Sequence, residues 1–222
     1  MIPALIIGRG GSSGLPGKNV MPVLGRPLML YPILAAKHAR GVDEVHISTD
    51  SPEIERIAID HGCRPIKRPP ELASNESLAE DAFQHGYRVI RDQAREPVEM
   101  IVLLFCNGAT IRPGLIDEGI EALRGNPRHD SACSVSQYNM WSPLRARRIG
   151  EDGLLHPFVP LEAFENASCD RNSQGDVYFA DCSAFIVRPH VLEDLEYGML
   201  PFRWQGRLIY PLLQWGGLDV DG

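Results

Sequence analysis

Short apolar runs alternate with longer segments of helical period over the first 135 residues. The short runs predict strands, and the longer segments predict amphipathic helices. The expected strands are 2–7, 45–48, 64–67, 100–105 and 131–135. The expected helices are 27–40, 51–61, 77–91 and 113–123. Strands and helices in this order predict a doubly wound α/β fold around a mostly parallel sheet.

Two of the expected helices begin with capping signals. Ser51 precedes Pro52 and Glu53, an arrangement that predicts a side-chain cap, a proline in the first turn and an acid near the positive helix end. Ser77 and Glu80 have the spacing of a capping box, which predicts that the next helix starts there.

The hydrophobic pattern changes near Gln137. Segments 144–149 and 154–158 flank a Glu-Asp-Gly turn at 151–153 and predict a β-hairpin. A polar stretch follows, and the short apolar runs 177–179 and 184–187 then predict strands that return to the core. We therefore expect a single domain over 1–222, with 137–176 inserted as a lid or a subunit contact.

The loop after the first strand is rich in glycine and carries two cations. It occupies 8–19 and reads Gly-Arg-Gly-Gly-Ser-Ser-Gly-Leu-Pro-Gly-Lys-Asn. Glycines such as Gly10 and Gly11 let backbone N–H groups approach anionic oxygens closely. Arg9 and Lys18 add positive charge, and the hydroxyls between them add donors. The loop therefore predicts a binding site for a phosphate chain.

Three common glycine motifs do not fit this loop. A P-loop would need glycine where Ser12 stands and Ser or Thr where Asn19 stands. A dinucleotide fingerprint would need glycine in place of Ser13. The Gly-x-Ser-x-Gly pattern at 10–14 matches a hydrolase elbow, but that elbow needs an earlier strand-helix loop, and only eleven residues precede Ser12.

Several loops are expected to meet at one edge of the sheet, because ligands of open α/β sheets bind beyond the carboxyl ends of the strands. These loops are 8–19, 48–50, 68–69 and 106–112. Asp219 and Asp221 could reach the same edge. Two carboxylates at i and i+2 of a strand point the same way and suit one magnesium ion, although Asp-x-Asp also occurs in solvated turns.

Composition narrows the class of protein. The net charge of −7 argues against a general nucleic-acid surface, but not against a nucleotide whose charge is met locally. No apolar run approaches the ~20 residues that span a membrane, so no membrane partner is expected. The five cysteines are widely separated, which predicts reduced thiols and a cytoplasmic location, with Cys106 notable for its place in a candidate loop.

Several segments of the chain, the glycine loop among them, resemble the acylneuraminate cytidylyltransferases, also called CMP-sialate synthetases. The glycine loop carries the most specific likeness, and further matching segments follow in order over nearly the whole chain. The segments are 9–19, 47–54, 67–73, 152–158, 177–179 and 219–221. The resemblance implies a fold like that of the nucleotide-diphospho-sugar transferases.

The resemblance also implies a reaction, in which CMP passes from CTP to the anomeric hydroxyl of a nonulosonic (sialic-like) or related 2-keto sugar acid, releasing pyrophosphate. On this reading the nucleotide contacts Arg9, Gly10, Gly11, Ser12, Lys18, Asn19, Arg68 and Asn107. Asp219 and Asp221 are expected to hold magnesium and, with Arg9 and Lys18, to form the catalytic set. Relatives are often dimers, so we expect a homodimer whose other partners are the two small-molecule substrates.

Three departures from the family pattern concern one cation of the glycine loop and the sugar half of the reaction. Ser13 stands where a lysine is usual, and 105–112 replaces a Gln-Pro-Thr-Ser-Pro-Leu-Arg signature. Asp181 and Cys182 replace an Asn-Gly pair. An extra acid beside an anionic sugar is unfavourable unless it faces a cation or hydroxyls. Two alternatives stay open: a nucleotidyltransferase for another base or a sugar 1-phosphate, and a nucleotide-binding homologue impaired in catalysis.

Overall fold

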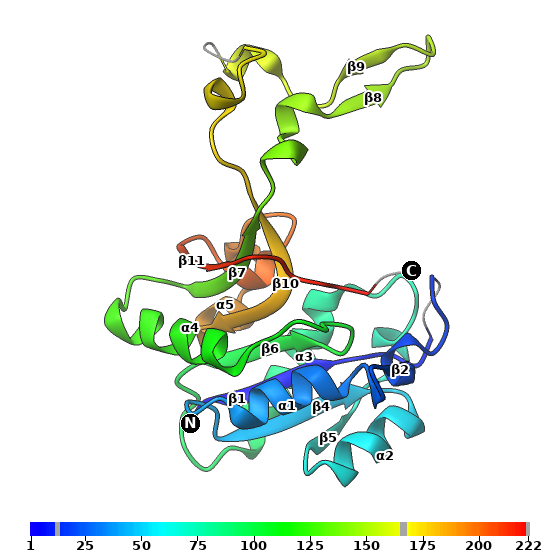
Figure 1. The fold of residues 1–222 in the computed structure, drawn as a ribbon. Coiled ribbons are helices and arrows are strands. Elements are labelled where there is room, and N and C mark those ends of the chain that lie inside the picture. The colour runs from blue at the N-terminus through cyan, green and yellow to red at the C-terminus, as the bar shows by residue number, and fades with distance from the viewer. Residues whose placement is uncertain (12–13, 165–167, 221–222) are drawn as a thin grey trace.

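A seven-stranded sheet forms the centre of the computed structural model, which describes residues 1–11, 14–164 and 168–220 (Figure 1). Its strand order is β11-β7-β10-β6-β1-β4-β5. The strands are β1 (Pro3–Ile7), β4 (Glu44–Thr49), β5 (Arg64–Lys67), β6 (Ile101–Phe105), β7 (Ser131–Gln137), β10 (Tyr178–Val187) and β11 (Ile209–Gln214). Only β10 runs antiparallel to its neighbours in this sheet, so the predicted mostly parallel α/β sheet is confirmed.

Helices cover both faces of the sheet (Figure 1). They are α1 (Leu30–His38), α2 (Pro52–Asp60), α3 (Ala79–Gln93), α4 (Pro113–Gly125) and α5 (Pro189–Glu193). Apolar residues of α1, α2 and α4 share one core cluster with Ile6, whereas those of α3 and α5 share the other with Leu5. Successive residues of a strand point to opposite faces, so the apolar run of β1 supplies both layers.

The four predicted helices are confirmed, but one capping signal is wrong. Ser51 caps α2 as expected, since its Oγ accepts from the N–H of Ile54 at 3.4 Å. The residue that precedes α3 is Leu78, without a side-chain cap. Ser77 instead donates its hydroxyl to the carbonyl oxygen of Ser74 at 2.8 Å, so a local turn takes the group that the capping box would have used.

Other elements differ from the sequence pattern. A small hairpin of β2 (Pro22–Val23) and β3 (Arg26–Pro27) delays the start of α1. The runs predicted as two strands, 177–179 and 184–187, form the single strand β10 with an irregularity between Ala180 and Phe185. The sequence pattern did not predict β11, which contains Pro211; the proline is tolerated because β11 lies at the sheet edge.

Residues 138–164 and 168–177, here called the arm, project from the end of β7 and lead back into β10 (Figure 1). The predicted hairpin is confirmed within the arm as β8 (Arg147–Ile149) paired with β9 (Leu155–Pro157). Gly153, with φ of 74°, takes the left-handed conformation that its turn needs. The arm holds several exposed apolar side chains: Met140, Trp141, Ile149, Leu154, Leu155 and Phe158.

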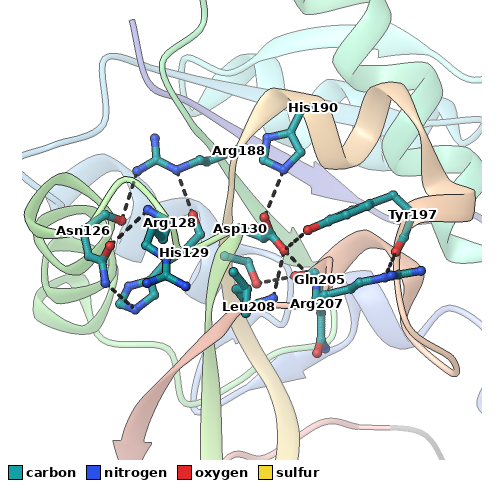
Figure 2. A network of polar contacts seen from close by, with 11 residues as sticks. Asn126, Arg128, His129, Asp130, Arg188, His190, Tyr197, Gln205, Arg207 and Leu208 are labelled. Carbon is teal, nitrogen blue, oxygen red and sulfur yellow. Dashed lines mark hydrogen bonds and ion pairs between the residues drawn. The ribbon is translucent and has the colours of Figure 1, made fainter.

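A buried carboxylate fastens the amino end of β7 to the start of β11 (Figure 2). Asp130 accepts from the N–H groups of Arg207 and Leu208, both at 2.8 Å. It also accepts from Tyr197 Oη and His190 Nε2, both at 3.0 Å. Burial by itself would raise the pKa of Asp130, but these four hydrogen bonds outweigh it and hold the pKa below its ordinary value.

We expect Asp130→Ala to lower the free energy of unfolding by about 2 to 4 kcal/mol, because it leaves four donors without their acceptor. The pKa of Asp130 in the folded protein lies below its value of about 3.9 in the unfolded chain. The stabilisation by Asp130 is therefore complete above about pH 5 and is lost as the pH falls through the pKa of the folded state. Urea unfolding between pH 7 and pH 2 would measure both effects.

The matched control is Asp60→Ala, which removes an exposed carboxylate paired with Arg56. Its effect should stay within about 0.5 kcal/mol. Equal destabilisation by the two variants would contradict the role given to Asp130.

Candidate functional site

Three parallel strands bring their carboxyl ends to one edge of the sheet. Ile7 at the end of β1 pairs with Ser48 of β4 and with Phe105 of β6. The next residues stay in register, since Gly8 donates to the carbonyl oxygen of Ser48 and Cys106 donates to that of Ile7. The loops that follow these strands therefore begin side by side, as the rule for open α/β sheets predicts.

A cavity of about 260 Å³ opens at this edge. It is lined by residues of the glycine loop, the segment after β5, the start of α3 and the loop after β6. Five of the residues predicted for the site lie on its wall: Arg9, Lys18, Asn19, Arg68 and Asn107. Segments far apart in the sequence thus supply three cations and two amides to one hollow.

The glycine loop leaves little room for side chains at two of its positions. A Cβ on Gly8 would lie 2.4 Å from Cys106 Sγ, and one on Gly10 would lie 3.0 Å from Ser51 Cβ. The N–H of Gly10 donates to Asp50 Oδ1 at 2.9 Å, which fixes the loop against the end of β4. Gly11 is exposed with open space around it, and the predicted Ser12 lies outside the described residues.

Asn19 and Arg9 hold the loop in shape. Asn19 is buried, and its Nδ2 donates to the carbonyl oxygen of Arg9 at 3.1 Å. The main-chain carbonyl oxygen of Asn19 accepts from the N–H of Met29 at 2.9 Å, which ties the loop to the segment before α1. Arg9 Nη1 donates to the carbonyl oxygen of Ser74 at 2.7 Å and so links the glycine loop to the segment before α3. Asn19 therefore has a clear structural role in addition to its place on the wall.

Arg68 is a buried cation, with 6% of its surface exposed. Its Nη2 donates to the carbonyl oxygen of Ser48 at 2.6 Å, and its Nε donates to Ser48 Oγ at 3.3 Å. Burial lowers the pKa of Arg68 and the charge of Arg9 acts in the same direction, whereas Asp50 opposes both. Two cations this close to a hollow favour an anionic ligand, because an anion offsets their desolvation and repulsion.

The last described residues of the chain line up against the loop after β6. Val220 donates its N–H to the carbonyl oxygen of Asn107, and Asn107 Nδ2 donates back to the carbonyl oxygen of Val220, both at 3.2 Å. Asp219 is paired with Gly108 in an antiparallel bridge. Asp219 thus lies one residue from the cavity wall, while Asp221 lies outside the described residues.

Two acids near this edge have structural partners that the sequence pattern did not reveal. Asp50 follows a predicted strand, a placement that could have marked it as a loop anchor. Asp181, the departure from the family pattern, faces the hydroxyls of Ser134 and Ser136. An extra acid at this position is tolerated if it faces a cation or hydroxyls, and Asp181 faces two hydroxyls.

The comparisons with known proteins agree with this geometry. A family model described as cytidylyltransferase matches residues 3–141. This chain belongs to the cytidylyltransferase family. The matched part contains the glycine loop, Arg68 and Asn107, and hence the described wall of the cavity.

Two relatives show how far the similarity of this family member extends. It is 34% identical over 134 residues to N-acylneuraminate cytidylyltransferase A of Danio rerio, a match that covers 60% of this chain and 30% of that protein. It is 30% identical over 193 residues to the CMP-N,N'-diacetyllegionaminic acid synthase of Legionella pneumophila, covering 83% and 80%. The chain thus spans under a third of the fish relative and most of the bacterial one.

The fold of this family member also matches solved structures. A CMP:2-keto-3-deoxy-manno-octonic acid synthetase, solved in complex with CTP, superposes with a TM-score of 0.69 at 17% sequence identity. The match covers 99% of this chain and 92% of that one, and it supports the α/β fold. In the part of the chain that the structure describes, no helix is long and apolar enough to cross a membrane.

We expect the cysteines of this family member to differ sharply in reactivity. Burial raises the pKa of the Cys106 thiol to about 12, and Cys106 packs under Gly8, so it should resist a disulfide reagent in the folded protein. Cys169 is exposed and should react within minutes. Thiol titration with and without denaturant measures this, and rapid modification of Cys106 in the folded state would contradict the described packing.

Proposed function

We propose that this chain binds CTP in the cavity at the carboxyl edge and transfers its CMP moiety to a nonulosonic or related 2-keto sugar acid, releasing pyrophosphate. The observation that carries the proposal is the convergence of Arg9, Lys18 and Arg68 on one cavity within the family match. The printed names of the relatives, which include N-acylneuraminate and N,N'-diacetyllegionaminic acid enzymes, support a sugar acid as acceptor.

In this reaction the anomeric hydroxyl oxygen of the sugar acid forms a bond to the α-phosphorus of CTP. The bond from that phosphorus to the β-phosphate oxygen breaks, pyrophosphate leaves with the bonding electrons, and the hydroxyl proton passes to water. The protein has little covalent chemistry to perform, so positioning and charge neutralisation dominate. Arg9, Lys18 and Arg68 supply charge to the triphosphate, and the open space around Gly11 allows its backbone to approach the phosphates closely.

Magnesium fits the residues at this edge. The described residues contain no group of three or more His, Cys, Asp or Glu side chains that could hold a metal ion without further ligands. Magnesium in nucleotide enzymes commonly takes only one or two carboxylates and completes its shell with water and phosphate oxygens. Asp219, next to the wall, together with Asp221, would hold it, and the ion would neutralise charge that develops on the phosphates.

Our proposal includes a homodimer and a cytoplasmic location. The arm projects away from the sheet (Figure 1) and carries exposed apolar side chains, which suits a subunit contact. No disulfide joins the five cysteines, all of which lie in the described part of the chain, as expected for a reducing compartment.

Incubation with CTP, magnesium and a panel of nonulosonic and octulosonic acids tests the proposed reaction. We expect pyrophosphate release with at least one sugar acid and a preference for CTP over GTP, UTP and ATP. Arg68→Met should raise the Kd of CTP at least about tenfold, because the buried guanidinium loses its contact with the anion.

Lys67→Met is the matched control, since Lys67 is the adjacent cation and is exposed. Its Kd for CTP should stay within about twofold. No pyrophosphate release from a folded sample with any sugar acid, or equal effects of the two variants, would count against the proposal.

A further inference from the structure

Asp181 is enclosed by protein donors. Its Oδ1 accepts from Ser134 Oγ at 2.5 Å and from the N–H of Ser183 at 3.1 Å. Its Oδ2 accepts from Ser136 Oγ at 2.6 Å and from Gln214 Nε2 at 2.7 Å. Burial would raise the pKa of Asp181, but these hydrogen bonds outweigh it and lower the pKa. A carboxylate with four donors is suited to holding structure rather than to taking up protons.

Asp181 and Ser136 also contact the chain that follows β11. Ser136 has one hydroxyl hydrogen and gives it to Asp181, so its lone pairs are left to accept from the N–H of Gly217 at 3.2 Å. A Cβ on Gly217 would lie 2.5 Å from Asp181 Cβ and 2.8 Å from the Asp181 carbonyl oxygen. The backbone of Gly217 is therefore seated directly against Asp181.

From that point the chain runs along the loop that carries the cavity wall. The N–H of Leu218 donates to Thr110 Oγ1 at 2.8 Å. Its carbonyl oxygen accepts from the N–H of Ala109 at 3.0 Å. Asp219 follows immediately in the bridge to the same loop. Two sets of contacts, one at Asp181 and one at 107–110, hold this short segment at both ends.

We propose that Asp181 is a positioning residue that sets the register of residues 217–220 against the loop 107–110, and through it the place of Asp219. Because a carboxylate only accepts, it orients the serine hydroxyls in one direction; an asparagine amide would donate and reverse one of them. The catalytic consequence rests on the proposed function, whereas the structural consequence does not. Asp181 acts through the segment and need not touch a substrate.

Hydrogen exchange of the wild-type chain and two variants tests the structural part without any substrate. Asp181→Ala should speed exchange at the N–H groups of Gly217, Leu218 and Val220 at least about tenfold beyond any change in the rest of the sheet. Ser136→Ala removes the acceptor of Gly217 and one of the four donors to Asp181, and it should produce a smaller change in the same amides. It also keeps the test valid where Asp181→Ala folds poorly.

Asp130→Asn is the control for general loss of stability, because it weakens an equally well-bonded carboxylate at the opposite end of β7. In this variant the amides of 217–220 should exchange no faster, relative to wild type, than those of the remaining sheet.

For activity, Asp181→Ala should lower kcat at least about tenfold with less than about a threefold change in the Kd of CTP. Asp181→Asn should be intermediate.

Unchanged protection of 217–220 in both variants would overturn the proposal, whatever the activity. So would exchange that rises uniformly over the sheet, because that marks a merely structural carboxylate. A wild-type chain without cytidylyl transfer would overturn the proposed function alone, since the exchange result still decides the role of Asp181.

Discussion

The register of β1 with β4 and β6 is the constraint on which the candidate site depends. Ile7 and Phe105 are the last residues of β1 and β6, and Ser48, one residue before the end of β4, lies level with them, so the loops that follow emerge together. The carbonyl oxygen of Ser48 then serves both the N–H of Gly8 and the guanidinium of Arg68. A slip of one residue in β4 would turn its side chains to the opposite faces and separate these groups.

Two buried or half-buried acids hold the ends of β7 to neighbouring segments of the chain. Asp130 ties β11 to the amino end of β7, whereas Asp181 ties the chain after β11 to the carboxyl end of β7. Both have several donors from elements that are distant in sequence, so each joins strands that hydrophobic packing alone would leave free to slide. The edge strand β11 is held at its two ends in this way, and its carboxyl end leads to Asp219.

The sequence pattern predicted most of the fold because strands such as β1 and helices such as α2 carry their signals locally. It predicted where the glycine loop, Arg68 and Asn107 would meet, because that edge follows from parallel topology. It missed β11, whose proline only an edge position explains, and the role of Asp130, whose partners lie 60 to 78 residues away. The capping box at Ser77 failed for a local reason, since Ser74 competes for its hydroxyl. The position of β11 and the partners of Asp130 depend on tertiary structure, which no local pattern encodes.

The most direct test of the central claim is a crystal structure of this chain with CTP and magnesium bound. We predict that the triphosphate lies in the cavity between the glycine loop and Arg68, with Asp219 on the side of the metal. CTP bound at another surface, or a triphosphate that contacts neither Arg9, Lys18 nor Arg68, would contradict the account.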